Sequence, residues 1–438
     1  MDTWLQHVSV VDGWLPITVL VLAVCAVLAL LVRRRARWWW WLLVVLVVPV
    51  AIGVAYGISV LLVDVLSVWP EALPDEVVLW GALGVGGLLL AVLAVVVPRF
   101  RWWRLLVAPV AVVLVAATAA LQINAYYGLF ATAADVLGRT PPVAAGIPPA
   151  LSLQGRPAFD SAGVSTGWRQ PAGMATTGVF RRIAIPGTVS RFTGGQALVY
   201  LPGAYLLPNR PKLPVLVLVA GQPGVPANWI AAGQIREVVD AFAARHQGLA
   251  PVVVMPDPNG TVGNTMCMNT ALGAADTYMA VDVPNWITRT LDVDGNPAHW
   301  AVGGFSYGGT CAIQMGTRHP ERYRSVIALG SEREPALSVD RRVTVGRAFG
   351  GDTSAFDRLL PMTLLRHRNY PTSTAFFAAG SADPVYQANA RVLEAAARAS
   401  GMRTELDIVP GVGHSYVMVR AALPRGLAFV ARSLGLSR

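Results

Sequence analysis

Charged residues are scarce in this chain of 438 residues, where Asp, Glu, Lys and Arg together make up only 14%. Hydrophobic residues make up 54%, and the mean hydropathy is +0.50. These values are too apolar for an ordinary soluble protein, so part of the chain is expected to lie in lipid. The length allows two or three domains.

Motifs that would indicate a bound cofactor are absent as well. The sequence holds no His and Cys cluster at metal-ligand spacing, no phosphate-cradling glycine loop and no dinucleotide-binding fingerprint. We therefore expect neither a metal nor a cofactor. The net charge of +10 does not indicate nucleic acid, because much of the basic excess sits in two short clusters beside apolar runs, which is typical of membrane topology.

Four apolar runs fill the first third of the chain, at 15–32, 38–63, 77–97 and 105–120. Each approaches or exceeds the roughly 18–20 residues that a helix needs to cross a bilayer. None has the polar stripe at helical spacing that a helix at the surface of a soluble core would present. The sequence therefore predicts a four-helix transmembrane anchor over 1–130.

Charge is distributed unequally over the connections between these runs. Because positively charged connections stay in the cytoplasm, the first and third connections are predicted to be cytoplasmic and both chain ends to lie outside. The N-terminus has no basic n-region, which argues against a cleaved signal peptide. We thus expect a multi-pass protein of a bacterial plasma membrane with its C-terminal part on the extracytoplasmic side. The residues behind this prediction are Arg33, Arg34, Arg35 and Arg37 in the first connection, Asp64, Glu71, Asp75 and Glu76 in the second, and Arg99, Arg101 and Arg104 in the third.

The remainder of the chain changes character twice. Residues 131–176 are rich in Pro, Gly, Ala and Ser without sustained periodicity and are predicted to be a linker. Over 177–438, strand-like runs alternate with helix-like ones, after a predicted hairpin at 180–185 and 196–201. This alternation predicts an α/β domain with a mostly parallel sheet and helices on both faces. The connection at 330–365 is long enough to form a cap.

The motif Gly304-x-Ser306-x-Gly308 stands between a short apolar run at 300–302 and a helix-compatible stretch. Flanking glycines permit so sharp a turn from strand to helix because they carry no Cβ. The turn raises the serine hydroxyl above the sheet, as in the nucleophile elbow of a serine hydrolase, so Ser306 is the predicted nucleophile. A second match to the pattern, at 163–167, has no apolar strand before it, and we interpret it as a loop.

A base and a carboxylate follow Ser306 in the chain order of the α/β-hydrolases. His414 lies in a glycine-hinged loop after the last predicted strand, where such a base is expected. Asp383 follows the preceding strand and would fix the tautomer of His414 and stabilise the imidazolium. Asp383 also stands directly before Pro384, where it would cap a helix, and the two roles are compatible.

The oxyanion hole requires two N–H donors. One is expected from the residue after the nucleophile, Tyr307, and the other from the loop 220–224 after an earlier strand. Pro223 has no N–H, so Gln222 is the favoured second donor. An ordinary turn would also explain the glycines of this loop.

Six motifs carry a family resemblance: Ile185-Pro186-Gly187-Thr188, Tyr200-Leu201-Pro202, Ala220-Gly221-Gln222-Pro223-Gly224, Met255-Pro256-Asp257-Pro258-Asn259-Gly260, Asp282-Val283-Pro284 and Gly304-Phe305-Ser306-Tyr307-Gly308-Gly309-Thr310-Cys311. Over about 177–438 the chain resembles the putative-esterase branch of the α/β-hydrolases, which includes esterase D-like enzymes and mycolyltransferases. The resemblance implies an acyl-enzyme on Ser306 and an oxyanion hole of Gln222 and Tyr307. The chain departs from the mycolyltransferases in offering Asp383 where they use a glutamate, and in carrying a four-helix anchor.

The sequence thus predicts a membrane-anchored, extracytoplasmic serine esterase or acyltransferase with a Ser-Asp-His triad. Its expected partners are the membrane and an acyl-ester or lipid substrate of the cell envelope, with no nucleic acid. Water would give hydrolysis, and a sugar or lipid hydroxyl would give transfer. Two alternatives stay open: mycolyltransferase-like transfer to an envelope sugar, and a non-catalytic envelope scaffold that uses the fold for binding.

The chain has only three cysteines. Cys25 lies in the first apolar run and is interpreted as an apolar filler. Cys267 follows a predicted strand and Cys311 lies in the first turns of the elbow helix, so both would face an oxidising compartment if the predicted topology is right. Loops after neighbouring parallel strands emerge at the same sheet edge, so we predict a disulfide between them. Two buried free thiols are the alternative.

Overall fold

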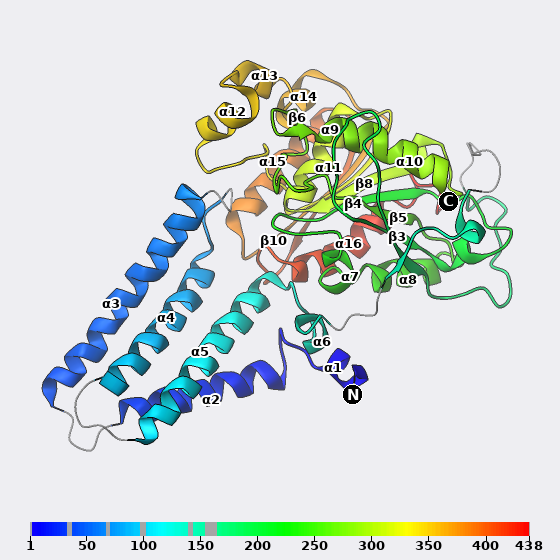
Figure 1. Ribbon diagram of the computed structural model, residues 1–438. Coiled ribbons are helices and arrows are strands. Elements are labelled where there is room, and N and C mark those ends of the chain that lie inside the picture. Colours follow the sequence, from blue (N-terminus) through cyan, green and yellow to red (C-terminus); the bar gives the residue numbers. More distant parts are fainter. Residues whose placement is uncertain are drawn as a thin grey trace. The chain divides into compact units, whose positions relative to one another are not determined.

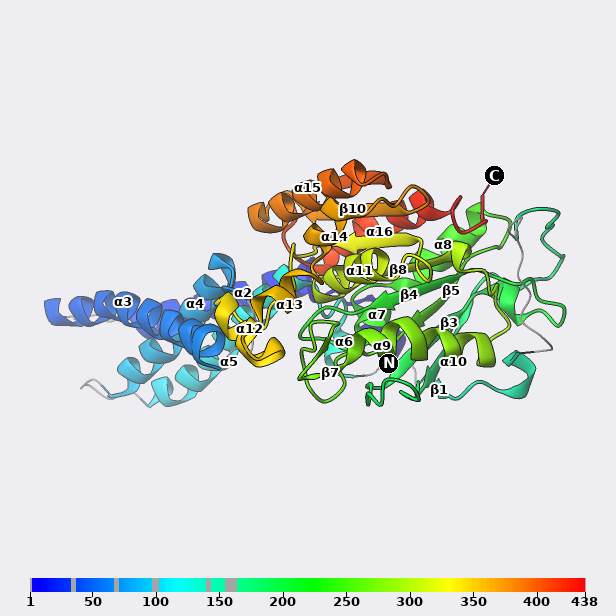
Figure 2. The same cartoon turned by 90° about the horizontal axis from the view of Figure 1, so that it is seen from above.

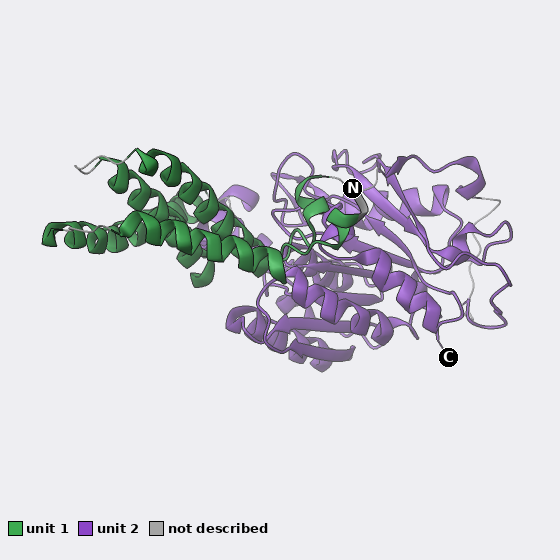
Figure 3. Ribbon diagram, turned by 90° about the horizontal axis from the view of Figure 1, so that it is seen from below, with its two compact units in different colours: residues 1–140 green, residues 141–438 purple. Residues whose placement is uncertain are grey.

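The computed structural model describes residues 2–32, 37–66, 71–96, 102–138, 143–153 and 164–437. The chain forms two compact units, Met1–Thr140 and Pro141–Arg438 (Figures 1 and 3). The arginines at 33–35, 99 and 101, on which the predicted orientation depends, lie outside the described residues.

The first unit contains four long apolar helices. They are α2 (Trp14–Leu31), α3 (Trp38–Val60) with its π-helical continuation η1 (Leu61–Val65), α4 (Asp75–Val96) and α5 (Trp103–Tyr127), and they are accompanied by the short helices α1 (Asp2–His7) and α6 (Ala133–Val136). All four are long and apolar enough to cross a membrane, which confirms the predicted helical region. Many of their large apolar side chains are exposed, such as Val45 and Leu106. Exposure of this extent suits a hydrocarbon solvent and not water.

Small residues bring these helices together. Helix α4 packs against both α3 and α5, and α2 packs against α4 and α5. A Cβ added to Gly87 of α4 would lie 2.6 Å from a methyl carbon of Val115 in α5, so this crossing depends on glycine. The same two helices are also joined by a hydrogen bond. Nη1 of Arg104 in α5 donates to the carbonyl of Ala94 in the last turn of α4, at 3.4 Å. A cation is favourable there because the carbonyls at a helix C-terminus carry partial negative charge.

The second unit is built on a nine-stranded sheet in the order β1-β2-β3-β5-β4-β8-β9-β10-β11. Strands β5, β4, β8, β9, β10 and β11 are parallel, and β3 runs antiparallel between β2 and β5. The strands are β1 (Ala144–Ala145), β2 (Val179–Ile183), β3 (Ala197–Leu201), β4 (Val215–Val219), β5 (Val252–Met255), β8 (Trp300–Phe305), β9 (Ser325–Leu329), β10 (Thr374–Gly380) and β11 (Arg403–Val409), with β6 (Asn269–Thr270) and β7 (Gly273–Ala274) in a separate pair. The predicted hairpin and mostly parallel sheet are confirmed.

Every residue of β3, β4, β5, β8, β9 and β10 is buried, because helices cover both faces of the sheet. Helices α11, α14 and α15 lie on one face, and α8 and α16 lie on the other (Figures 1 and 2). The helices of this unit are α7 (Asn228–Ala231), α8 (Ile235–Arg245), α9 (Ala275–Thr277), α10 (Val283–Thr290), α11 (Tyr307–Arg318), α12 (Arg341–Phe349), α13 (Thr353–Asp357), α14 (Pro361–His367), α15 (Pro384–Ala399) and α16 (Tyr416–Val430), together with the 3-10 turns η2 (Pro149–Leu151), η3 (Gly203–Leu206) and η5 (Pro297–His299) and the π-helical turn η4 (Tyr278–Asp282).

Two local details differ from the sequence interpretation. One of the helix-like runs between the predicted strands forms two helices, α7 and α8, because the chain turns at Gly233 and passes through a left-handed residue, Gln234. Strand β1 lies inside the segment 131–176, where it pairs with β2 at the sheet edge. The predicted boundaries 1–130, 131–176 and 177–438 stay predictions.

Candidate active site

Ser306 stands alone between the end of β8 and the start of α11. Its backbone has φ 57° and ψ −120°, a region that residues with a side chain rarely adopt. The amide of Ser306 donates to the carbonyl of Leu329 at 2.8 Å, and its own carbonyl accepts from the amide of Thr310 at 2.9 Å. The neighbouring strand and the first turn of the helix therefore hold the strained conformation in place.

The glycines on either side of Ser306 are required by close backbone contact. A Cβ added to Gly304 would overlap the backbone of Gly308, and a Cβ added to Gly308 would overlap the carbonyl oxygen of Val219 in β4. Helix α11 can therefore start directly above the ends of two strands only because these positions have no side chain. The sharp turn from strand to helix that the glycine motif predicts is therefore present in the structure.

His414 reaches the same region from the loop between β11 and α16. Its ring stacks on Tyr386 at 3.8 Å between centroids and packs on Phe305, the residue before Ser306, at 4.7 Å. A Cβ added to Gly330 would lie 2.8 Å from Cε1 of His414. Within the part of the chain that the structure describes, neither ring nitrogen makes a hydrogen bond. Burial lowers the pKa of His414 to about 3, so the imidazole is neutral near pH 7, which is the form of a general base.

Asp383 divides its two carboxylate oxygens between two neighbours. Oδ1 accepts from the amides of Val385 and Tyr386, both at 3.1 Å, so the residue caps α15 as expected. Oδ2 lies 3.9 Å from Nδ1 of His414, which is too long for a hydrogen bond, and the two groups would form an ion pair only when the imidazole is protonated. Burial raises the pKa of Asp383, and the two helix amides oppose this by favouring the carboxylate.

The two predicted oxyanion donors come from segments that adjoin Ser306. Tyr307 is the first residue of α11, so its amide is among the free N–H groups at the positive end of that helix. A Cβ added to Gly221 would lie 3.5 Å from Cβ of Ser306, which places the loop after β4 beside the serine. The side chain of Gln222 accepts from Asn264 Nδ2 at 3.4 Å. The assignment of both amides as oxyanion donors stays a prediction.

Three further residues contact this machinery and were not identified from the sequence. The phenol of Tyr416 is hydrogen-bonded to the backbone of Gly221, and burial raises its pKa. Thr265 Oγ1 lies 3.0 Å from the hydroxyl of Tyr307. Asn264 Nδ2 donates to the carbonyl of Ala336 at 3.0 Å as well as to Gln222. Of these three residues, only Tyr416 could have been suspected from the sequence, because it follows the predicted base His414 by two residues.

The connection predicted to form a cap folds into α12, α13 and α14. It packs Leu337, Val345 and Phe356 against Met266 and Met268 in a small core of its own. This core is separate from the sheet and joins the cap to the loop that follows β5.

That same loop is attached along one face of α11. Four helix residues at intervals of four, three and four contact it, and such spacing places them in one line along a helix. The hydroxyl of Tyr307 lies 3.0 Å from that of Thr265, and Cys311 is joined to Cys267 in a disulfide with the Cα atoms 5.4 Å apart. One turn further along, the side-chain amide of Gln314 donates to the carbonyl of Met266 at 3.0 Å. Arg318 donates to the carbonyl of Cys267 at 2.7 Å.

We predict that the Cys267–Cys311 bond forms in the protein and stabilises the elbow helix. Closing a loop of this size contributes about 4 kcal/mol in the chain-entropy model, less any strain. Thiol titration of unreduced, denatured protein should find one free thiol, that of Cys25, and reduction should raise the count to three. The Cys25→Ala variant serves as the control and should show none before reduction. Three free thiols in the unreduced wild type would contradict the bond.

Comparison with known proteins agrees with this architecture. The sequence profile of the family described as "Putative esterase" matches residues 195–433, more than half of the chain. An uncharacterized protein of Corynebacterium glutamicum is 36% identical over 270 residues, which are 59% of this chain and 63% of that protein. The match thus spans less than two thirds of the relative's own length.

Two solved structures are similar in fold to the second unit. A ferulic acid esterase aligns with a TM-score of 0.51 and 20% identity over 60% of this chain and 100% of that one. An S-formylglutathione hydrolase from Agrobacterium tumefaciens aligns with a TM-score of 0.50 and 20% identity over 59% of this chain and 97% of that one. The chain carries a hydrolase-like α/β domain behind four apolar helices, and it belongs to the putative esterase family.

Proposed function

We propose that the protein is a membrane-anchored serine esterase or acyltransferase that acts on acyl esters of the cell envelope from the extracytoplasmic side. The observation that supports this most is the conformation of Ser306, at φ 57° between β8 and α11. A strained serine backbone at a strand-to-helix turn, with a buried histidine packed on the preceding residue, suits a nucleophile and its base. Membership of the esterase family supports ester chemistry.

In the proposed reaction, Ser306 Oγ attacks the acyl carbonyl carbon while His414 accepts the hydroxyl proton. The carbonyl oxygen becomes an oxyanion and is bound by the amides of Gln222 and Tyr307, at the positive end of α11. The tetrahedral intermediate collapses, and His414 returns the proton to the departing alcohol. An acyl-enzyme remains, and water or another hydroxyl attacks its carbonyl carbon while His414 takes the proton. The second tetrahedral intermediate then collapses with Ser306 Oγ as the leaving group, His414 returns the proton to Ser306, and the acid or the new ester is released. Asp383 stabilises the imidazolium in both steps.

The first prediction is that a fluorophosphonate probe labels the protein at Ser306. Labelling should fall by more than about a thousand-fold in Ser306→Ala, since no other group replaces the nucleophile. The matched control is Ser165→Ala, which removes the serine of the second glycine-flanked motif and should leave labelling unchanged. A wild type that resists the probe would favour the non-catalytic scaffold.

A second prediction concerns pH. Burial lowers the pKa of His414 to about 3, below the ordinary value of about 6.5, so the base stays unprotonated over that interval. The labelling rate should therefore stay level as pH falls through 6.5 and decline only at much lower pH. The unfolded chain binds the proton over the same interval, so unfolding free energy should fall as pH is lowered there, and less so in His414→Gln. An acid limb centred near 6.5 would contradict the assignment.

The third prediction is the topology. Alkaline phosphatase fused to the C-terminus should be active, because this reporter folds only outside the cytoplasm. The same reporter fused after Arg37, in the first arginine-rich connection, should be inactive. The reverse pattern would place the second unit in the cytoplasm and remove the reason to expect an envelope substrate, while leaving the chemistry of Ser306 untouched.

A further inference from the structure

A cavity of about 420 Å³ lies within the first unit, among the four long apolar helices. Side chains of α2, α3 and α4 form most of its wall, and α5 contributes Val115, Thr118 and Ala119. A volume of this size is within the range of roughly 300–1,000 Å³ that small-molecule sites occupy. All four helices belong to one compact unit, so the wall is complete without the second unit.

The floor of the cavity is made of small residues. Ala23 of α2, Ala51 of α3 and Ala82 of α4 line it and are buried. A Cβ added to Gly86 of α4 would lie 3.6 Å from Cβ of Ala51, which is an ordinary van der Waals distance. The packing of α4 on α3 therefore does not require glycine at this position, in contrast to Gly87 against α5. The side chain that Gly86 lacks leaves its space to the cavity.

The rim of the cavity consists of larger aliphatic side chains. They line the cavity and are also exposed, so they mark where it opens to its surroundings. For helices that cross a bilayer, these surroundings are lipid chains. The rim residues are Val24 and Leu28 on α2, Val48 and Ile52 on α3, and Leu83 on α4.

The cavity is long in the direction of the helices. On α4 its lining extends from Leu79 to Leu90, which corresponds to about 16 Å at 1.5 Å per residue. This length is more than half of the roughly 30 Å of the hydrocarbon core of a bilayer. A long site with an aliphatic wall suits an extended hydrocarbon chain better than a compact ring.

The interior of the cavity offers little to a polar ligand. Thr118 carries the one hydroxyl of the described lining, and its Oγ1 donates to the carbonyl of Leu114 in its own helix at 2.8 Å. The carbonyl of a quinone or the hydroxyl of a sterol would therefore be buried there without a donor or acceptor set aside for it. Only the hydrocarbon part of a lipid matches this wall.

Polar groups are found at one end of the lining instead. Trp80 lies near the start of α4, where its half-buried indole has no hydrogen-bond partner among the described residues. Tryptophan is common at the level of lipid head groups, where its N–H meets ester and phosphate oxygens. Asp75 and Glu76 in the first turn of α4 are exposed. Their carboxylates favour a head group with an amine over an anionic one.

We propose that this cavity binds one acyl chain of a membrane glycerophospholipid, with the head group at the Trp80 end. The four helices then form a lipid-binding unit as well as an anchor. Water does not fill an apolar cavity in the hydrocarbon core, and an empty cavity would leave its lining without van der Waals contacts. Phospholipid chains are the most abundant hydrocarbon at the rim, so mass action favours them over rarer isoprenoid chains.

A helix from a second copy of the chain fits the cavity less well. Helices approach closely in membranes where small residues lie at the contact surface. Here the small residues lie on the floor, and the rim that a second helix would meet first consists of Val, Leu and Ile. A narrow chain can pass between these side chains and reach the floor.

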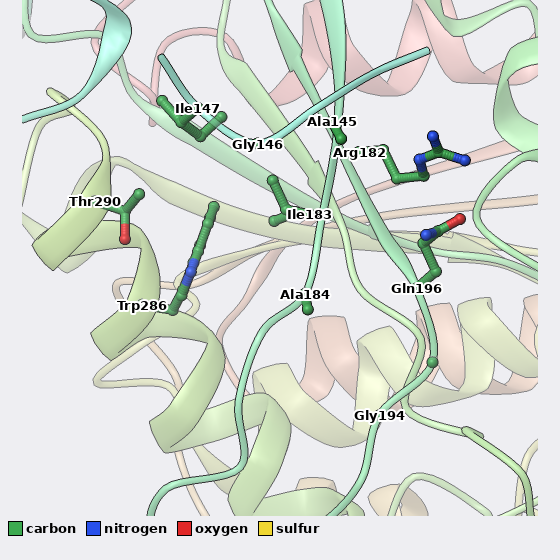
Figure 4. A pocket seen from close by; sticks show the side chains of 11 residues that line it. Ala145, Gly146, Ile147, Arg182, Ile183, Ala184, Gly194, Gln196, Trp286 and Thr290 are labelled. Atoms are coloured by element: carbon green, nitrogen blue, oxygen red, sulfur yellow. The ribbon is translucent and has the colours of Figure 1, made fainter. Parts of the chain in front are cut away.

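The cavity at the sheet edge of the second unit does not carry a comparable site. It has a volume of about 650 Å³ and lies beside β2 and α10. Figure 4 shows Trp286 facing Ile183, whereas Arg182 and Gln196 project to the other side of the sheet. Successive side chains of a strand point to opposite faces, so Arg182 and Ile183 do not meet one ligand.

The test uses the full-length protein in nanodiscs that contain phosphatidylethanolamine with a photoactivatable diazirine in the middle of one acyl chain. Peptide mass spectrometry after irradiation locates the cross-links. Val47 lines the cavity and is buried, whereas Val45 on the same helix is exposed and lies outside the lining. Bulk lipid reaches Val45, but a chain reaches Val47 only by entering the cavity. Both residues should be cross-linked in the wild type.

Two variants fill the cavity from different helices, Gly86→Leu on α4 and Ala23→Leu on α2. In each, cross-linking at Val47 should fall by about fivefold or more, because the leucine occupies the space of the chain. Cross-linking at Val45 should not change, which verifies that the helices remain in the membrane. The matched control is Gly81→Leu on α4, outside the lining and with no atom within 4 Å of an added Cβ, which should behave like the wild type.

Absence of cross-links at Val47 in the wild type, or cross-links there that persist in both filled variants, would overturn the site. Loss of the Val47 cross-link after addition of a small fraction of undecaprenyl phosphate would show that an isoprenoid chain is the preferred occupant, against the proposal. A dimer by native mass spectrometry that excludes the probe from Val47 would assign the cavity to a second copy. The test makes no use of Ser306, so its failure would leave the proposed function standing.

Discussion

The elbow at Ser306 rests on direct contact between backbones. Gly304 meets Gly308, and Gly308 meets the carbonyl of Val219, with no side chain between them. This contact sets the height at which α11 leaves the sheet, and so it sets where the serine hydroxyl and the amide of Tyr307 stand. Any Cβ at these glycines would push the helix outward and relax the strain that Ser306 carries. The proposed chemistry is therefore built on the packing of β4, β8 and α11.

Helix α11 has a second role as the support for the surrounding loops. Its face from Tyr307 to Arg318 holds the loop after β5 by two side-chain hydrogen bonds to backbone carbonyls, a hydroxyl pair and a disulfide. Through Met266 and Met268 this loop contacts α12 and α13, the helices of the predicted cap. Local unfolding of α11 would thus displace both the predicted cap and the turn at Ser306, so these two parts are expected to unfold together.

One segment carries the predicted base, His414, and also supports the loop after β4. His414 packs on Phe305, and two residues later the phenol of Tyr416 bonds the backbone of Gly221 while its ring packs on the same Phe305 at 5.0 Å. The loop after β4, which carries Gln222, is therefore positioned by the segment that delivers the histidine. The predicted base and the predicted oxyanion donor are therefore held by the same segment, so their relative placement does not depend on two independent loops.

The sequence by itself determined the features that are local or periodic. Four uninterrupted apolar runs predicted the four helices, because a helix with no polar face has to be solvated by lipid or core. The alternation of strands and helices predicted the layered sheet, and the glycine spacing around Ser306 predicted the elbow, because both are written into consecutive residues. The tertiary structure decided what residues distant in the chain do together. Thr265 reaches Tyr307, Tyr416 reaches Gly221, and Asp383 stands 3.9 Å from His414 only through loops without any periodic pattern.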